Sequence, residues 1–513
     1  MALPASRHPA TGSIACDLLV VGGGINGAGI ARDAAGRGLS VVLCDKDDLA
    51  AHTSSASTKL IHGGLRYLEH YEFGLVRKAL TEREVLLRAA PHIMWPLRFV
   101  MPHDRGQRPA WMIRVGLFLY DHLARRALLP GSATIDLRRH VAGKPLKKTF
   151  TRGFVYSDGW VDDARLVVLN AMDAAEKGAT ILTRTECLSV QRGDNAWQAT
   201  LGGIAGDITQ VRARCVVNAT GPWASQFLEN AAHQPSRKSV RLVKGSHIVV
   251  RKMFDHAHAY IFQHPDGRII FAIPYEQDFT LIGTTDIDYT GKAEQVAIDA
   301  AEIDYLCTLS NRYFNDPISP ADVVWSYSGV RPLLEDACAD ASAVTRDYQL
   351  DFDTAHAPML SVFGGKITTF RKLAEEAVDL IAAHFGNAAG AWTDRACLPG
   401  GDLFGPAPEN RSVLEFGAYC AGLQARYDWL PASLVARYAR AYGTRVHVLL
   451  QGCTARADLG DEIAPGLFAV EVDYLRCHEW ARTAADILWR RSKLGLHVPK
   501  GTAATLDAWI ASH

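Results

Sequence analysis

Three glycines and one aspartate near the N-terminus have the types and spacing that could bind a dinucleotide. Gly22, Gly24 and Gly27 follow the G-x-G-x-x-G pattern, directly after an apolar run at residues 17–21 that predicts a buried parallel strand. The pattern predicts a tight turn at Gly22, close approach of the backbone to a pyrophosphate at Gly24, and close helix packing at Gly27. It indicates a dinucleotide without separating NAD from FAD.

A helix and a second strand are predicted to follow this turn. The helix would begin near Asn26 and end near residue 37, so that its N-terminal N–H groups point at the phosphates. Residues 40–43 predict the second strand. Asp45 stands just past its end, where a carboxylate accepts hydrogen bonds from ribose hydroxyls.

A loop rich in serine and threonine, at residues 53–67, contains the sequence His-Gly-Gly. Its small hydroxyl side chains could donate to phosphate oxygens, and its glycines could bring bare backbone against a flat ring. The alternative is a structural loop followed by a helix cap. The candidate cofactor residues of this loop are Thr53, Ser54, Ser57, His62, Gly63 and Gly64.

Two later segments again combine an apolar strand with a glycine turn. Residues 214–221 end in Asn-Ala-Thr-Gly, and because an NAD enzyme has no need of this distant return to the first sheet, the segment favours FAD. Residues 360–370 run from a strand through Gly-Gly into a helix start, which suits the flavin carbonyl where negative charge gathers on reduction. The candidate residues are Ala219, Thr220, Gly221, Gly364, Gly365, Lys366 and Thr368.

The elements that would position these residues predict an α/β fold with three parts. Residues 241–251 and 268–285 alternate like antiparallel strands, and the chain is helical beyond a Pro- and Gly-rich linker at 398–408. We expect a discontinuous Rossmann-like FAD domain, an antiparallel-sheet substrate domain and a C-terminal α-helical domain. The expected ranges are 14–92, 150–235 and 355–397 for the FAD domain, 93–149 and 236–354 for the substrate domain, and 409–513 for the helical domain.

Composition argues against several classes of protein. Lys plus Arg equals Asp plus Glu at 55 each, and no basic stripe carries interleaved aromatics, which argues against nucleic-acid binding. The ten cysteines form no C-x-x-C pair, so we expect a reducing compartment and no metal site. Because no run of 18 apolar residues and no signal-peptide core is present, a cytoplasmic or peripherally attached protein is expected.

Residues 105–126 are the candidate membrane contact. An apolar helix face bordered by arginines can lie among the headgroups of an anionic membrane, but it can equally be a core helix with a solvated side. The expected apolar arc contains Met112, Ile113, Gly116, Leu117, Leu119, Tyr120 and Leu123, with Arg114, Asp121 and Arg125 opposite.

Taken together, these motifs resemble the aerobic FAD-dependent glycerol-3-phosphate dehydrogenase family, which is membrane-associated and passes electrons to quinone. The family usually carries Glu where this chain has Asp45, although the shorter acid can still reach ribose. The resemblance rests on residues 21–34, 54–84, 158–165, 218–223, 244–247, 283–286, 327–332 and 363–369.

The resemblance implies oxidation of sn-glycerol 3-phosphate to dihydroxyacetone phosphate, with hydride transfer to FAD and electrons passed to ubiquinone or menaquinone. It also implies a homodimer that is attached peripherally to the inner face of the cytoplasmic membrane, where the helix at residues 105–126 is the candidate contact with anionic lipids. The family's substrate-site residues map onto Arg66, Tyr67, Thr284, Arg331 and Lys366.

The chemistry of these residues suits a phosphorylated alcohol. Arg66, Arg331 and Lys366 could hold a phosphate, because guanidinium forks match its geometry and each charge-assisted hydrogen bond contributes about 1.5–3 kcal/mol. Oxidation also requires a base for the hydroxyl proton. His62 and Lys366 are both candidates, and the sequence does not choose between them.

The nearest alternative is a flavin oxidase of a small amino acid or carboxylate that uses O₂. The same FAD motifs serve both enzymes, but one arginine would suffice for a carboxylate, so three cations favour phosphate. A flavin-bound protein with a structural or RNA-modifying role is disfavoured by the zero net charge. An NAD enzyme would leave the two later glycine turns without a task.

Overall fold

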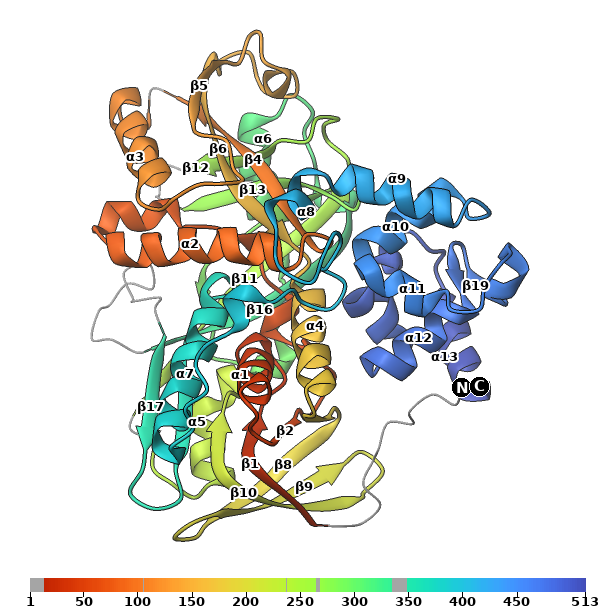
Figure 1. The fold of residues 1–513 in the computed structure, drawn as a ribbon. Coiled ribbons are helices and arrows are strands. Elements are labelled where there is room, and N and C mark those ends of the chain that lie inside the picture. Colours follow the sequence, from red (N-terminus) through yellow and green to blue (C-terminus); the bar gives the residue numbers. More distant parts are fainter. Residues whose placement is uncertain (1–12, 105, 237, 264–267, 335–347) are drawn as a thin grey trace.

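The computed structural model describes residues 13–104, 106–236, 238–263, 268–334 and 348–513, without the side chains of Arg66 and His70. Two sheets stand end to end, and the last hundred residues form a helical domain at their side (Figure 1). The expected α/β architecture with a C-terminal helical domain is confirmed.

The first sheet contains the parallel strands that the glycine motifs predicted. Its strands are β1 (Ser13–Val21), β2 (Val41–Cys44), β7 (Thr180–Leu182), β8 (Thr185–Arg192), β9 (Trp197–Gly203), β10 (Ile208–Asn218), β17 (Gln349–Asp353) and β18 (Met359–Phe363). The central path runs β17-β18-β10-β1-β2-β7, and β8 and β9 join it through β10. The middle strands are almost wholly apolar because both faces are covered.

Helices pack on one face of this sheet, as the lower half of Figure 1 shows. They are α1 (Ile25–Gly36), α4 (Asp163–Glu176) and α7 (Phe370–Phe385). The other face packs against side chains of β8, β9 and the short α5 (Ala224–Gln226).

Four parallel strands end at the same edge of the first sheet. Val21 lies beside Cys44 on one side and Asn218 on the other, and Asn218 lies beside Ser361. The turns that follow β1, β2, β10 and β18 therefore meet at this edge, which is where ligands bind in open parallel sheets.

The second sheet is antiparallel except where β12 runs parallel to β4. Its strands are β3 (Leu60–Ile61), β4 (Met94–His103), β5 (Ala133–Asp136), β6 (Arg152–Val161), β11 (Val240–Arg251), β12 (Ala259–Gln263), β13 (Ile269–Tyr275), β14 (Phe279–Gly283), β15 (Ile287–Asp288) and β16 (Val323–Leu334). β3 and β6 lie within the ranges expected for the FAD domain but hydrogen-bond in this sheet. The helices beside it are α2 (Phe73–Ala89), α3 (Ala110–His122) and α6 (Ala300–Tyr313).

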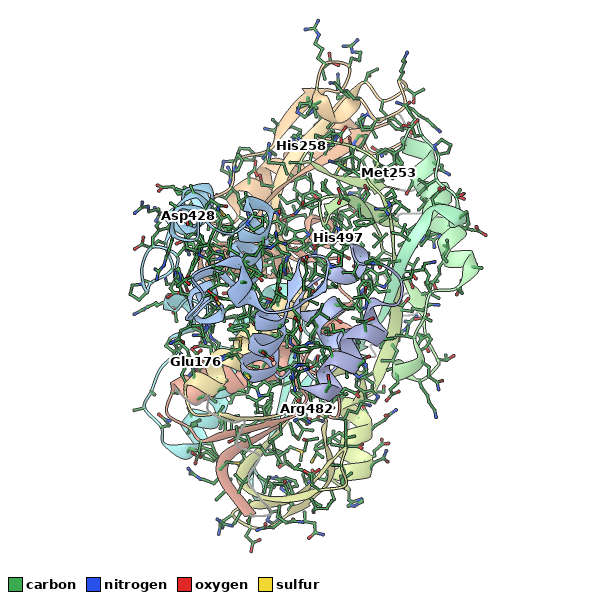
Figure 2. The ribbon with its side chains drawn as sticks, turned by 90° about the vertical axis from the view of Figure 1, so that its right-hand side faces the viewer. Glu176, Met253, His258, Asp428, Arg482 and His497 are labelled. Atoms are coloured by element: carbon green, nitrogen blue, oxygen red, sulfur yellow. The ribbon has the colours of Figure 1, made fainter. Side chains whose placement is uncertain are left out.

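The C-terminal helical domain has its own apolar core. Figure 2 faces this domain, with Arg482 toward its lower border and His497 toward the second sheet. Its elements are α8 (Asn410–Leu414), α9 (Phe416–Arg426), α10 (Ala432–Tyr442), α11 (Val446–Leu449), β19 (Glu462–Ala464), β20 (Leu467–Phe468), α12 (Ala469–Glu479) and α13 (Thr502–Ser512). Buried ion pairs join it to the rest of the chain, among them Arg165 with Glu479 and Arg491 with Asp48.

The prediction that one apolar face of residues 105–126 contains Met112, Leu117, Leu119 and Tyr120 together was partly wrong. Leu117 and Tyr120 of α3 pack into the core beside α2, and Asp121 is buried, where it accepts hydrogen bonds from Ser132. The exposed face instead carries Trp111, Met112, Val115, Phe118 and Leu119. The helix is apolar on several sides, so periodicity could not show which side meets the core.

Within the described residues, the cysteines form no disulfide and no cluster of side chains could hold a metal ion. No helix of the described part is long and apolar enough to span a bilayer.

Candidate active site

A cavity of about 610 Å³ lies where the four turns meet. It extends from the edge of the first sheet to residues of the second sheet, including Gly245 and Gly329. The lining includes most of the residues that the sequence analysis singled out: Gly22, Gly24, Asn26, Asp45, Thr53, Ser54, Ser57, His62, Tyr67, Ala219, Thr220, Gly221, Arg331, Gly364, Gly365, Lys366 and Thr368.

The first turn has no space for side chains at its glycines. Gly22 adopts φ +109°, and a Cβ there would lie 2.5 Å from the Ala219 carbonyl oxygen. A Cβ at Gly27 would lie 1.9 Å from the Gly22 carbonyl oxygen. Helix α1 therefore packs directly on the strand end, and its N-terminus faces the cavity with the positive end of its dipole.

Asp45 occupies the end of β2 beside this turn. Its carboxylate accepts hydrogen bonds from the amides of Gly23 at 2.6 Å and Asp47 at 2.8 Å. Burial raises the pKa of Asp45 to about 6, against the opposing effect of these hydrogen bonds. Without a ligand, the carboxyl group of Asp45 therefore takes up a proton as the pH falls through about 6.

Long-range hydrogen bonds tie the turns together around the cavity. The Ile25 amide donates to Ser54 Oγ at 3.0 Å, and Asn26 Nδ2 donates to the Gly364 carbonyl at 3.3 Å. Thr53 Oγ1 donates to the Val330 carbonyl at 2.8 Å. Asn26 Oδ1 is buried without a hydrogen-bond partner among the described residues, although Asn26 lines the cavity.

Comparison with known families identifies the family of this chain. The model of the family described as FAD dependent oxidoreductase matches residues 17–371. The chain belongs to this family. Residues 391–511 match the C-terminal domain of alpha-glycerophosphate oxidase.

Two curated relatives of this FAD dependent oxidoreductase are each 53% identical to it. One is D-erythritol 1-phosphate dehydrogenase of Brucella abortus, aligned over 96% of this chain and 97% of that protein. The other is glycerol-3-phosphate dehydrogenase of Pseudomonas aeruginosa, aligned over 97% of this chain and 95% of that protein. The resemblance to the aerobic FAD-dependent glycerol-3-phosphate dehydrogenase family is confirmed.

A solved structure supports the same assignment. The glycerol-3-phosphate dehydrogenase of Bacillus halodurans, complexed with FAD, superposes with a TM-score of 0.78 at 26% identity and covers 99% of this chain and 91% of that one. FAD is accordingly the cofactor of this oxidoreductase. The residues present fit it, since the cavity offers the N-terminus of α1, a ribose acceptor at Asp45 and Asn26 Oδ1, which has no partner among the described residues.

Two candidate cations of this oxidoreductase, Arg331 and Lys366, come from segments that are distant from Asp45 in the sequence. Arg331 of β16 pairs with Asp286 at 2.8 Å and donates to Thr284 Oγ1 at 3.2 Å. Lys366 precedes the helical turn at Ile367–Thr369, and its Nζ lies 3.9 Å from the ring centroid of Tyr67. Arg331, Lys366 and Tyr67 all line the cavity.

Four candidate residues do not line the cavity but lie directly behind its wall. Gly27 packs under Gly22, and Thr284 accepts a hydrogen bond from Arg331. Gly63 and Gly64 form the turn that presents His62, whose amide donates to Thr368 Oγ1 at 3.3 Å. The side chain of Arg66 lies outside the described part of the structure, so its expected role stays a prediction.

His247 lines the cavity and was not among the expected site residues. Its ring stacks on Tyr327 with centroids 4.7 Å apart, and its Nε2 lies 3.0 Å from Thr58 Oγ1. Burial lowers the pKa of His247 well below its usual value, and Arg331 and Lys59 act in the same direction. The ring is therefore neutral. The sequence Lys-Gly-Ser-His at 244–247 matched the family, but it did not indicate that His247 lines the cavity.

Proposed function

We propose that this protein oxidises sn-glycerol 3-phosphate to dihydroxyacetone phosphate and passes the electrons to a membrane quinone. The observation that carries the proposal is the meeting of Arg331 and Lys366, from distant segments, in the cavity that also contains His62. Two cations suit a phosphate that bears nearly two negative charges.

The side chains have separate tasks in this proposal. Arg331 binds the phosphate, with its guanidinium oriented by Asp286 and Thr284. His62 or Lys366 takes the proton of the C2 hydroxyl, a step that contributes roughly 10²- to 10⁴-fold in rate. The turns at Gly22, Gly221 and Gly365 would hold FAD, which would supply the acceptor for the hydride of C2. The ring of Tyr67 contacts the Lys366 ammonium group and so restricts the positions that this group can adopt in the cavity.

A four-carbon polyol phosphate is the second candidate substrate, because a relative named D-erythritol 1-phosphate dehydrogenase is as similar as a glycerol-3-phosphate dehydrogenase. Both substrates present a phosphate and a neighbouring secondary alcohol. The same cations and the same base could bind and oxidise either substrate. An experiment must therefore compare polyol phosphates of different chain length.

An anaerobic titration of the purified holoprotein tests both substrates. The flavin absorbance near 450 nm should bleach with glycerol 3-phosphate or erythritol 1-phosphate, and not with glycerol or glycine. Bleaching by glycine instead would favour an amino acid oxidase and contradict the proposal. A quinone analogue should then restore the colour faster than O₂ does, with little peroxide formed.

The exposed face of α3 supports a peripheral membrane contact as part of this proposal. Trp111 is 67% exposed, and Met112, Val115, Phe118 and Leu119 are exposed beside it. Arg108 and Arg125, which flank the helix, suit anionic headgroups. We therefore expect the protein to lie on the inner face of the cytoplasmic membrane.

Liposome flotation tests this contact. Trp111→Glu with Phe118→Glu should abolish binding to vesicles of phosphatidylglycerol and phosphatidylethanolamine. Leu414→Glu is the matched control, since Leu414 is 65% exposed on α8 of the helical domain. Undiminished flotation of the double variant would contradict the proposed contact, and an equal loss in the control would show that the effect is not specific to α3.

A further inference from the structure

A buried hydrogen-bond network holds the turn that presents His62. The Gly63 amide donates to Tyr120 Oη at 2.8 Å, with a longer approach of 3.4 Å to Asp158 Oδ1. The Tyr120 hydroxyl lies 2.8 and 3.0 Å from the two Asp158 carboxylate oxygens. Tyr120 comes from α3 and Asp158 from β6, so two distant elements fix one backbone amide.

The charge of Asp158 is balanced inside the same network. Arg83 of α2 donates to Asp158 Oδ1 at 2.6 Å and to the Ser157 carbonyl at 2.9 Å. The three side chains of Arg83, Tyr120 and Asp158 are all nearly inaccessible to solvent. A buried ion pair keeps its geometry, because separating the charges would leave both buried and unpaired.

The direction of each hydrogen bond follows from this arrangement. Burial and the neighbouring Asp158 raise the pKa of Tyr120 well above its ordinary value, so the hydroxyl keeps its proton. It must donate that proton to Asp158, which is acceptor-only when ionised. The Tyr120 oxygen is then oriented to accept from Gly63, as the 2.8 Å distance indicates.

The turn fits closely against this network. A Cβ at Gly63 would lie 2.4 Å from Leu80 Cδ2 and 2.7 Å from Tyr120 Oη. On the cavity side, His62 lines the wall, and the Gly64 carbonyl accepts from the Tyr67 amide at 2.9 Å. A shift of Gly63 would therefore move both His62 and Tyr67, and with Tyr67 the surroundings of Lys366.

We propose that Tyr120, Asp158 and Arg83 are positioning residues that hold the His62 turn in its reactive geometry. The inference rests on the proposed dehydrogenase function, because it assigns the network to the two candidate bases of that reaction. None of the three lines the cavity, so they act through the turn and not on the substrate. A misplacement of about 1 Å can lower a rate by about a hundredfold.

Tyr120→Phe in the full-length holoprotein is the test, because it removes one hydroxyl and keeps the ring. Its matched control is Tyr275→Phe, since Tyr275 is equally buried and its hydroxyl has no hydrogen-bond partner in the described part of the chain. The rate of anaerobic flavin reduction by glycerol 3-phosphate should fall about 10- to 100-fold in Tyr120→Phe, while KM changes less than about threefold. Tyr275→Phe should match the wild type within about twofold.

Hydrogen exchange gives a second readout that needs no substrate. A peptide covering residues 60–66 should exchange faster in Tyr120→Phe than in Tyr275→Phe, with equal flavin content and equal Tm. Asp158→Asn should also speed exchange at residues 60–66, because it removes the charge that orients the tyrosine hydroxyl, but at a lower Tm, since it leaves the Arg83 guanidinium buried without its partner.

Three outcomes would overturn the inference. One is a reduction rate for Tyr120→Phe within about twofold of the wild type, and another is unchanged exchange at residues 60–66. The third is loss of flavin from both Tyr120→Phe and Asp158→Asn, which would assign the network to folding alone. If the wild type were reduced by no polyol phosphate, the proposed function would fail, while the exchange measurement would still test the network.

Discussion

Lowering the pH should weaken FAD binding through Asp45. The carboxyl is buried at the end of β2, and this burial raises its pKa to about 6. Ribose hydroxyls need the charged carboxylate as an acceptor, so the protonated group must release its proton before FAD binds. Since the unliganded protein holds this proton below about pH 6, affinity should fall as the pH drops through that value.

The size of the effect follows from the pKa. At about pH 5, only about a tenth of the unliganded protein carries the charged form of Asp45. If ribose binding returns the pKa to its ordinary 3.8, the complex stays mostly charged at that pH. The Kd for FAD should then be about tenfold higher at about pH 5 than at about pH 8, which equals about 1.4 kcal/mol.

Titration of apoprotein with FAD, followed by flavin fluorescence at both pH values, measures this ratio. Asp45→Asn should bind FAD more weakly at neutral pH and show no dependence on pH. His52 lines the same cavity and its charge lowers the pKa of Asp45, so His52→Gln should keep the dependence but move it to higher pH. A constant Kd in the wild type, or the full dependence in Asp45→Asn, would refute the reasoning.

Three further substitutions test other parts of the structure. Gly27→Ala should lose FAD, because the new Cβ would lie 1.9 Å from the Gly22 carbonyl oxygen. Gly116→Ala is the control, since a Cβ there meets no atom within 4 Å. The ratio of flavin to protein absorbance should fall in the first variant and stay unchanged in the second. Arg331→Ala should retain FAD but raise KM for glycerol 3-phosphate and lower kcat/KM about tenfold or more, since a charge-assisted bond contributes about 1.5–3 kcal/mol; unchanged kinetics would remove Arg331 from the site. Asp48→Asn should lower the free energy of unfolding by about 3–5 kcal/mol, because it leaves the Arg491 guanidinium buried without its partner. Calorimetry that shows a loss below about 1 kcal/mol would contradict this last expectation.

The cofactor turns could be predicted from the sequence because each is encoded within a few residues. The glycines from Gly22 to Gly27 specify a strand, a turn and a helix start, and the later turns at Gly221 and Gly365 repeat the pattern. Parallel strands of one sheet end at a common edge, so these turns meet wherever the intervening chain goes. All three turns line one cavity, as expected.

The partners of those turns could not be predicted, because they come from distant segments that carry no local signal. Gly63 bonds to Tyr120, 57 residues away, and lies near Asp158, 95 residues away. Tyr120 looked like one member of an apolar helix face, and only the packing of α3 on α2 shows that its hydroxyl points at a backbone amide. For the same reason, the exposed side of α3 could not be told from its buried side.

Ion pairs join the C-terminal helical domain to the loop beside the cofactor site. No residue beyond Thr368 lines the cavity within the described part of the chain. Yet Arg490 and Arg491 both donate to Asp48, at 2.6 Å each, three residues after Asp45. Burial of these charges ties the loop after β2 to the helical domain, because moving the domain away would deprive the buried Asp48 carboxylate of both of these arginine partners. The helical domain also contacts β16 directly, where the rings of Trp489 and Trp325 stack with centroids 4.3 Å apart.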